Sequence, residues 1–158
     1  MTSNYFTNVT FASYPNSNLI SLFSCDEKYF IKYGIYNILS SDNIGQDIHV
    51  NVINPTHKTF EKIESIQKHL RVNLTYSFEN YTTDHWYALK SYFFCNRYFL
   101  AKEIFNKTNV ETVYITDADI IYKQSIIFPQ QKELGIIFKP TANNLWNQTG
   151  GNFIFIKK

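Results

Sequence analysis

Two acidic residues, Asp117 and Asp119, lie in an otherwise apolar segment of this 158-residue chain. An unpaired carboxylate is costly to bury, so we expect cations or hydrogen-bond donors beside them. In an extended backbone both carboxylates would point to one face and Ala118 to the other. Two such oxygen ligands suit Mg²⁺ or Mn²⁺ with coordination positions left for a substrate diphosphate. The alternatives are a solvated turn and a pair of acids bound to Lys or Arg.

Two basic residues upstream are candidates to act with these acids. Lys90 and Arg97 are seven residues apart, about two turns along one side of a predicted helix over 86–105. An apolar stripe along this helix, which includes Phe93 and Leu100, predicts that the helix is buried. Arg can bind phosphate through two parallel hydrogen bonds, whereas Lys acts as a point charge. The alternative is a side chain that follows the edge of the apolar stripe and ends in water, and we favour it for Lys90. For Arg97 we expect a functional role.

The elements that must position these residues follow from the periodicity of the sequence. Apolar or alternating runs predict strands over 19–25, 47–53, 72–78, 110–116, 134–138 and 153–156. Helical spacing predicts a helix after each of the first three strands, over 26–40, 56–70 and 86–105. Asp26 or Ser24 would cap the first of these helices. This alternation indicates an α/β fold with a mainly parallel sheet, which binds ligands beyond the carboxyl ends of its strands.

Composition and charge narrow the class of protein. The chain is 44% hydrophobic, and its length favours a single domain over 18–158 after an N-terminal tail over 1–17. The net charge of +2 comes from scattered Lys and Arg, so no nucleic-acid or membrane surface is expected. Cys25 and Cys95 predict free thiols in a reducing, cytoplasmic compartment. We predict neither a signal peptide nor a transmembrane segment.

Residues 97–121, with Arg on a helix, then a strand, then Asp-x-Asp, resemble the central block of the family 8 glycosyltransferases and their GT-A relatives. Residues 22–29 resemble the first strand and turn of that family, and residues 149–156 resemble its small-residue turn before a strand. The resemblance implies a GT-A fold, with a mostly parallel sheet, helices on both faces and a Rossmann-like first half. It also implies retaining transfer from a nucleoside-diphosphate sugar, a UDP-sugar above all, to a carbohydrate, lipid or protein acceptor, with Mn²⁺ or Mg²⁺ as cofactor.

The same resemblance implies a role for individual residues. Asp117 and Asp119 would bind the metal and, with Arg97, stabilise the charge on the departing diphosphate. Asp26 would bind the edge of the base, and Tyr29 would stack on it. The further expected contacts with the nucleotide sugar are Ser24, Cys25, Lys90, Ala118, Gly150 and Gly151. For Cys25 a place in the core is the alternative.

Two other functions remain open on the sequence. Members of the family continue for many residues after the small-residue turn and supply a His ligand there, and nothing in this chain matches that region. We therefore expect a C-terminally incomplete domain and retain a non-catalytic nucleotide-sugar-binding module as one alternative. The other is a phosphatase of the haloacid dehalogenase type with Asp117 as nucleophile. Against it, that motif normally lies on the first strand and continues with Thr or a small residue, whereas Ile120 and Ile121 follow here.

Overall fold

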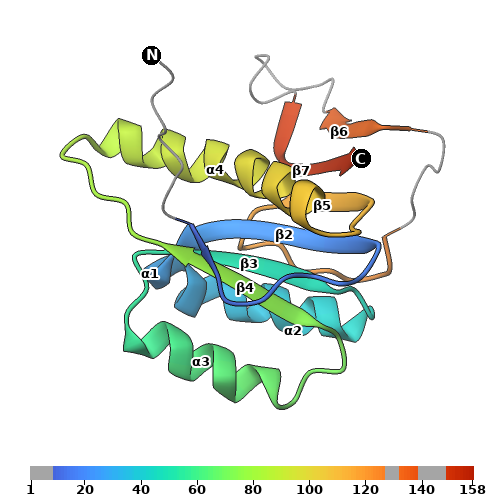
Figure 1. Ribbon diagram of the computed structural model, residues 1–158, viewed down its shortest axis with the longest axis horizontal. Coiled ribbons are helices and arrows are strands. Elements are labelled where there is room, and N and C mark those ends of the chain that lie inside the picture. Colours follow the sequence, from blue (N-terminus) through green and yellow to red (C-terminus); the bar gives the residue numbers. More distant parts are fainter. Residues whose placement is uncertain (1–8, 127–131, 139–148) are drawn as a thin grey trace.

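Seven strands form one sheet with helices on both of its faces (Figure 1). The computed structural model describes residues 9–126, 132–138 and 149–158. The strands are β1 (Thr10–Phe11), β2 (Leu19–Asp26), β3 (Ile48–Ile53), β4 (Leu74–Glu79), β5 (Thr112–Thr116), β6 (Leu134–Phe138) and β7 (Thr149–Lys157). The helices are α1 (Glu27–Tyr29), a π-helical turn (Phe30–Gly34) that leads into α2 (Ile35–Asn43), α3 (His57–Gln67) and α4 (Trp86–Lys107). The predicted α/β class is confirmed.

The order of the strands places β2 and β5 side by side near the middle of the sheet. The full order is β1-β4-β3-β2-β5-β7-β6. β4, β3, β2 and β5 are parallel, whereas β1, β7 and β6 run antiparallel to their neighbours. The sheet is therefore mixed, with its parallel part in a Rossmann-like order. From β2 the chain builds outward through β3 and β4, and then returns to the other side of β2 for β5.

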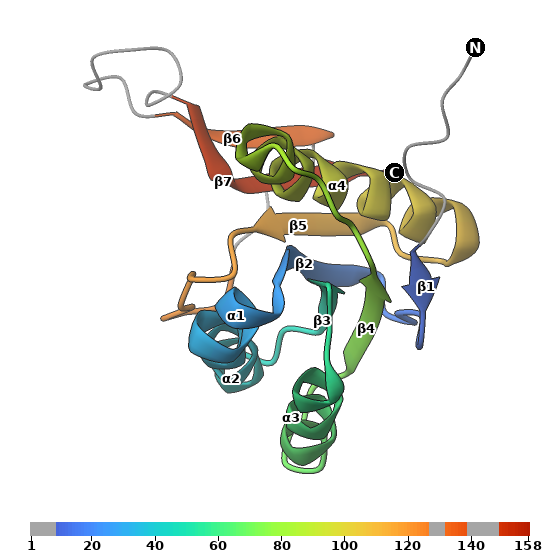
Figure 2. The same ribbon diagram turned by 90° about the vertical axis from the view of Figure 1, so that its left-hand side faces the viewer.

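α2 and α3 cover one face of the sheet and α4 covers the other (Figure 2), and each face has its own core. On the face covered by α2 and α3, Val50 and Val52 of β3 pack in a cluster with Ile38 and Ile63 of those helices. On the face covered by α4, the cluster is made by β2, β5, β7 and the helix, with the buried residues Ile20, Leu22, Leu100, Ala101, Ile104, Val110, Val113, Ile115 and Ile154. Strands that are covered on both faces read as nearly continuous apolar runs, and this explains why their positions are clear in the sequence.

Burial of α4 is uneven along its length. Leu100 and Ile104 in the second half are at most 1% exposed, whereas Trp86 and Tyr87 at the start are 60% and 69% exposed. The prediction of a buried helix is therefore correct only for its second half. Among the described residues no helix has the length and apolarity needed to cross a bilayer.

Part of the predicted N-terminal tail belongs to the sheet. Thr10 and Phe11 form β1, which pairs with Phe78 and Ser77 at the edge of β4. The ring of Phe11 stacks on Tyr14, with 4.6 Å between the ring centroids, and contacts the core under α4. A strand of two residues is too short to show a period, so the sequence pattern does not reveal it.

Asp42, near the end of α2, joins that helix to the loop before β4. Its Oδ1 accepts hydrogen bonds from the backbone N–H groups of Arg71, at 2.7 Å, and Val72, at 3.1 Å. The Asp42 side chain is 13% exposed and also pairs with the Arg71 guanidinium at 3.4 Å. Burial raises the pKa of the Asp42 carboxyl, but the two N–H donors and the charge of Arg71 outweigh it, so the pKa lies below its usual value.

We expect Asp42→Asn to lower the free energy of unfolding by about 1 kcal/mol at neutral pH, because the charged acceptor is lost. A carboxyl whose pKa is lower in the folded state stabilises the fold above the unfolded pKa, and this stabilisation disappears as the pH falls through the folded pKa. In urea unfolding, the difference between wild type and variant should be constant down to about pH 5 and shrink below about pH 4. A difference that stays constant down to strongly acidic pH would contradict this account.

Candidate functional site

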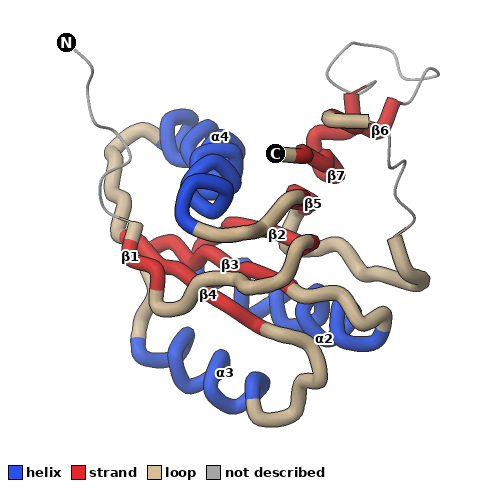
Figure 3. The backbone as a smooth tube through the Cα atoms, turned by 45° about the vertical axis from the view of Figure 1, so that its right-hand side comes forward, coloured by secondary structure: helices blue, strands red, loops and turns tan. Residues whose placement is uncertain are grey.

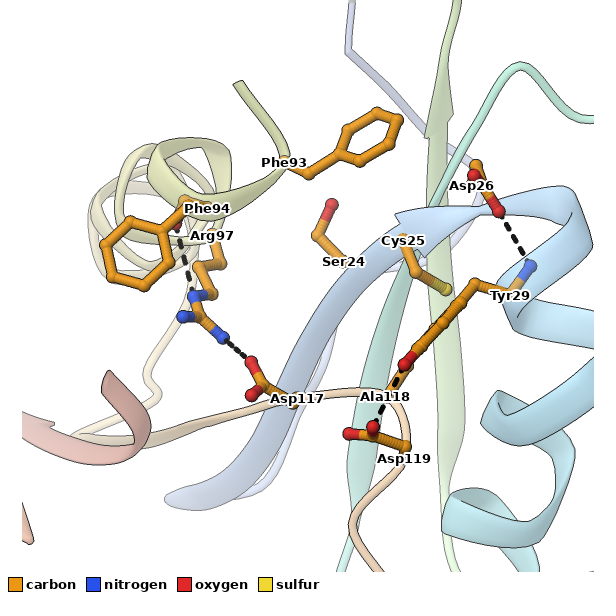
Figure 4. A pocket seen from close by; sticks show the side chains of 10 residues that line it. All are labelled: Ser24, Cys25, Asp26, Tyr29, Phe93, Phe94, Arg97, Asp117, Ala118 and Asp119. Carbon is orange, nitrogen blue, oxygen red and sulfur yellow. Dashed lines mark hydrogen bonds and ion pairs between the residues drawn. The ribbon is translucent and has the colours of Figure 1, made fainter. Parts of the chain in front are cut away.

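A cavity of about 290 Å³ opens where β2 and β5 end (Figure 4). Its lining residues are Ser24, Cys25, Asp26, Tyr29, Phe93, Phe94, Arg97, Asp117, Ala118 and Asp119. β2 and β5 flank the point at which the chain order of the strands reverses, and open α/β sheets bind their ligands at such a point. The fold thus brings eight of the eleven predicted site residues together, although they come from three separate segments of the chain.

Arg97 connects α4 to the end of β5. Its Nη1 donates to Asp117 Oδ1 at 2.5 Å and to the carbonyl oxygen of Thr116 at 3.3 Å. Its Nε donates to the carbonyl oxygen of Phe94 at 3.2 Å, and its guanidinium lies 4.6 Å from the centroid of the Phe94 ring. The Arg97 side chain is 4% exposed and that of Asp117 is 42% exposed. A buried guanidinium with these acceptors has little freedom, so it fixes the orientation of the Asp117 carboxylate.

Asp119 has a different partner. The Tyr29 hydroxyl donates to Asp119 Oδ2 at 2.9 Å. This hydrogen bond, together with burial and the negative charge of Asp119, raises the pKa of Tyr29 to about 12. Asp26 caps α1, as predicted, by accepting from the backbone N–H of Tyr29 at 2.6 Å. Tyr29, expected to stack on a base, therefore also holds one of the acids.

The backbone that carries the two acids differs from the prediction. β5 ends at Thr116, and a turn follows in which the Ile120 N–H lies 3.3 Å from the carbonyl oxygen of Asp117. The expectation of extended backbone with parallel carboxylates is therefore wrong. Figure 4 shows Asp117 directed at Arg97 and Asp119 directed at Tyr29, on either side of Ala118. Both carboxylates nevertheless line the same cavity.

Polar side chains of α2 form hydrogen bonds with the backbone of this turn and of the residues that follow it. Asn37 Nδ2 donates to the carbonyl oxygen of Asp117 at 3.0 Å, and Ser40 Oγ accepts from the N–H of Tyr122 at 3.0 Å. The Tyr122 hydroxyl in turn donates to Ser21 Oγ at 3.1 Å. Asn37 and Ser40 were not among the residues expected at the site, although polar residues three apart among apolar ones on a helix are a signal of a buried contact. The turn is thus anchored on both sides of the two acids.

The two carboxylates of the β5 turn are oxygen ligands of the kind that Mg²⁺ and Mn²⁺ prefer. Asp117 Oδ2 and Asp119 Oδ1 have no polar partner among the described residues, so one oxygen of each acid is open to a ligand. Within the described ranges no cluster of three or more His, Cys, Asp and Glu residues could hold a metal. A cation bound here would therefore complete its coordination with water or phosphate oxygens, as Mg²⁺ often does.

The remaining predicted site residues lie as follows. Cys25 is 5% exposed and packs in the core under α2, and burial, then the charge of Asp26, raises the pKa of its thiol well above the usual value. Both cysteines are free, as predicted. The side chain of Lys90 lies outside the described residues. Gly150 and Gly151, expected in a turn, belong to β7, which pairs with β5.

No known protein family has a model that matches this chain, and among curated proteins none has significant sequence similarity to it.

We expect Asp119→Asn to lower the pKa of Tyr29 from about 12 towards the usual value of about 10, because the phenolate no longer faces a negative charge. NMR titration of tyrosines labelled at Cζ, with Tyr29→Phe to assign the resonance, measures this shift. Asp117→Asn is the matched control and should move the Tyr29 pKa much less, since Asp117 contributes only the smallest of the charge effects. An unchanged pKa in Asp119→Asn would show that the two side chains do not interact in solution.

Proposed function

We propose that this chain is the nucleotide-sugar-binding domain of a metal-dependent GT-A glycosyltransferase. The observation that carries the proposal is the charge of the cavity at the ends of β2 and β5. Its lining residues include three carboxylates, those of Asp26, Asp117 and Asp119, and one guanidinium, that of Arg97. An anionic diphosphate alone would be repelled there, whereas a diphosphate bound together with a divalent cation would be attracted.

The side chains of the cavity would have different roles in binding the nucleotide sugar and the cation. Asp117 and Asp119 would hold the cation, which when bound supplies Lewis-acid stabilisation of charge on the diphosphate. Arg97 fixes the orientation of Asp117 and adds a positive charge beside the departing group. Phe93 and the partly exposed ring of Tyr29 offer aromatic contacts for the base. The resemblance to family 8 supports a UDP-sugar donor and retention of configuration, and the acceptor is a carbohydrate, a lipid or a protein.

A binding module without transferase activity would share this cavity, so activity must be measured separately from binding. Release of UDP from UDP-glucose or UDP-galactose, with and without acceptors, separates the enzyme from the module. The phosphatase alternative has less support, because Asp117 follows β5, the fourth parallel strand in chain order, and not the first.

Titration calorimetry of UDP should show binding in the presence of Mn²⁺ that a chelator abolishes. We expect Asp117→Asn and Asp119→Asn each to weaken this binding about tenfold or more, because each removes a charged metal ligand. Glu64→Gln, which neutralises an exposed acid on α3, is the matched control and should bind like the wild type. Folded wild-type protein that does not bind UDP, or acid variants that bind it as tightly as the wild type, would overturn the proposal.

A further inference from the structure

The face of the sheet under α4 changes from apolar to polar between β2 and β3. Over β3 and β4, the buried polar side chains on this face are His49, Asn51, Thr75, Ser77 and Glu79, each at most 3% exposed. Hydrogen bonds connect them into one network that reaches the cavity at Ser24. The function proposed above leaves this network unused. Polar groups are buried only when their hydrogen bonds are made, so the network must have a definite arrangement.

Glu79 anchors the network because a buried carboxylate can only accept hydrogen bonds. It is 2% exposed and accepts from Asn51 Nδ2 at 2.7 Å, from Asn96 Nδ2 and from the Tyr92 hydroxyl. Within the described part of the chain it has no Lys or Arg partner. Among the described residues, three uncharged donors therefore compensate this buried charge, and the loss of any one of these hydrogen bonds would be costly.

The orientation of the Asn51 amide follows from this anchor. Its NH₂ group must face Glu79, so the same group also donates to Ser24 Oγ, at 3.0 Å, and its Oδ1 accepts from Ser77 Oγ, at 2.8 Å. Asn51 is fully buried, and all three of these contacts are made at once. The amide thus has one arrangement that satisfies every partner, and a flipped amide would place its oxygen against a carboxylate.

The far end of the network agrees with this assignment. The Ser77 hydroxyl gives its proton to Asn51, so it can only accept from His49 Nε2, at 3.1 Å, and His49 Nδ1 then accepts from Thr75 Oγ1, at 2.8 Å. Burial lowers the pKa of His49 to about 3, which keeps the ring neutral near pH 7. The hydrogen bonds therefore all run in one direction, from Thr75 through His49, Ser77 and Asn51 to the two acceptors Glu79 and Ser24.

Ser24 is the point at which this direction reaches the cavity. Its oxygen accepts from Asn51, and no described residue accepts its own proton. Ser24 lines the cavity beside Cys25 and opposite Phe93, at the end of β2, whereas the two acids follow β5. The Ser24 hydroxyl can therefore donate a hydrogen bond to a ligand in the cavity. It comes from the end of β2, whereas Asp117 and Asp119 come from the turn after β5.

Ser24 is among the nucleotide contacts that the resemblance implies. We propose that Asn51 and Glu79 are positioning residues that keep the Ser24 hydroxyl free to donate a hydrogen bond to a base or ribose oxygen of the bound nucleotide. This inference rests on the function proposed above. Buried Asn51 and Glu79 would then act on ligand affinity through Ser24, without touching the ligand.

The first test compares two substitutions of Ser24 by calorimetry with UDP and Mn²⁺. Ser24→Ala should weaken UDP binding about five- to tenfold, the effect of one hydrogen bond, whereas Ser24→Thr keeps the hydroxyl and should bind within about twofold of the wild type. Binding of inorganic pyrophosphate with Mn²⁺ should be the same in Ser24→Ala and the wild type, because the contact is to the nucleoside. An equal loss for UDP and pyrophosphate would overturn the assignment.

A double-mutant cycle tests the two positioning residues. Asn51→Ala should weaken UDP binding in the wild type but have no further effect in Ser24→Ala, because it acts only through Ser24. Glu79→Gln should behave in the same way with a smaller loss. Thr75→Val, at the far end of the network, is the structural control, and it should lower stability but leave the dissociation constant for UDP unchanged.

The outcomes are distinguishable. Absence of UDP binding by the folded wild type overturns the proposed function, and the inference with it. UDP binding that is equal in wild type and Ser24→Ala overturns only the inference. Losses from Asn51→Ala and Ser24→Ala that simply add would contradict the positioning role. If Asn51→Ala does not fold, Glu79→Gln in the two Ser24 backgrounds completes the cycle.

Discussion

The ion pair between Arg97 and Asp117 is the interaction on which the site depends. It joins the middle of α4 to the residue that follows β5, and thus sets the distance between the helix and the edge of the sheet that carries the cavity. Arg97 is almost fully buried, so removing Asp117 would take a charged partner away from a buried guanidinium, and removing Arg97 would take an anchor away from the acid-bearing turn.

The two faces of the sheet support this site in different ways. Under α2, Asn37 and Ser40 hold the turn after β5 (Figure 3 shows the layers of helix and sheet). Under α4, the polar network over β3 and β4 ends at Ser24, on the other wall of the cavity. Both walls are therefore set by buried hydrogen bonds, and we expect a cavity that is largely formed before a ligand binds.

Much of the fold could be predicted from the sequence because strands covered on both faces give clear apolar runs, and because Asp26 marks the start of a helix. The meeting of Arg97 with the Asp-x-Asp segment followed from helix spacing and sheet topology. The sequence left open whether Asp117 and Asp119 lie in extended backbone or in a turn, and extended backbone was the wrong choice. The turn depends on tertiary contacts from Asn37 and Tyr29, which are far away in sequence. The polar network was missed for the same reason, since His49, Asn51 and Glu79 are ordinary strand residues until pairing places them side by side.

The central claim is that Asp117 and Asp119 bind one divalent cation together with a nucleoside diphosphate. Anomalous diffraction from crystals grown with Mn²⁺ and UDP tests it most directly, because the signal locates the metal without reference to activity. The account predicts one strong manganese peak within coordination distance of both carboxylates and of the UDP phosphates. Manganese bound elsewhere while UDP occupies the cavity, or UDP bound away from the ends of β2 and β5, would contradict it.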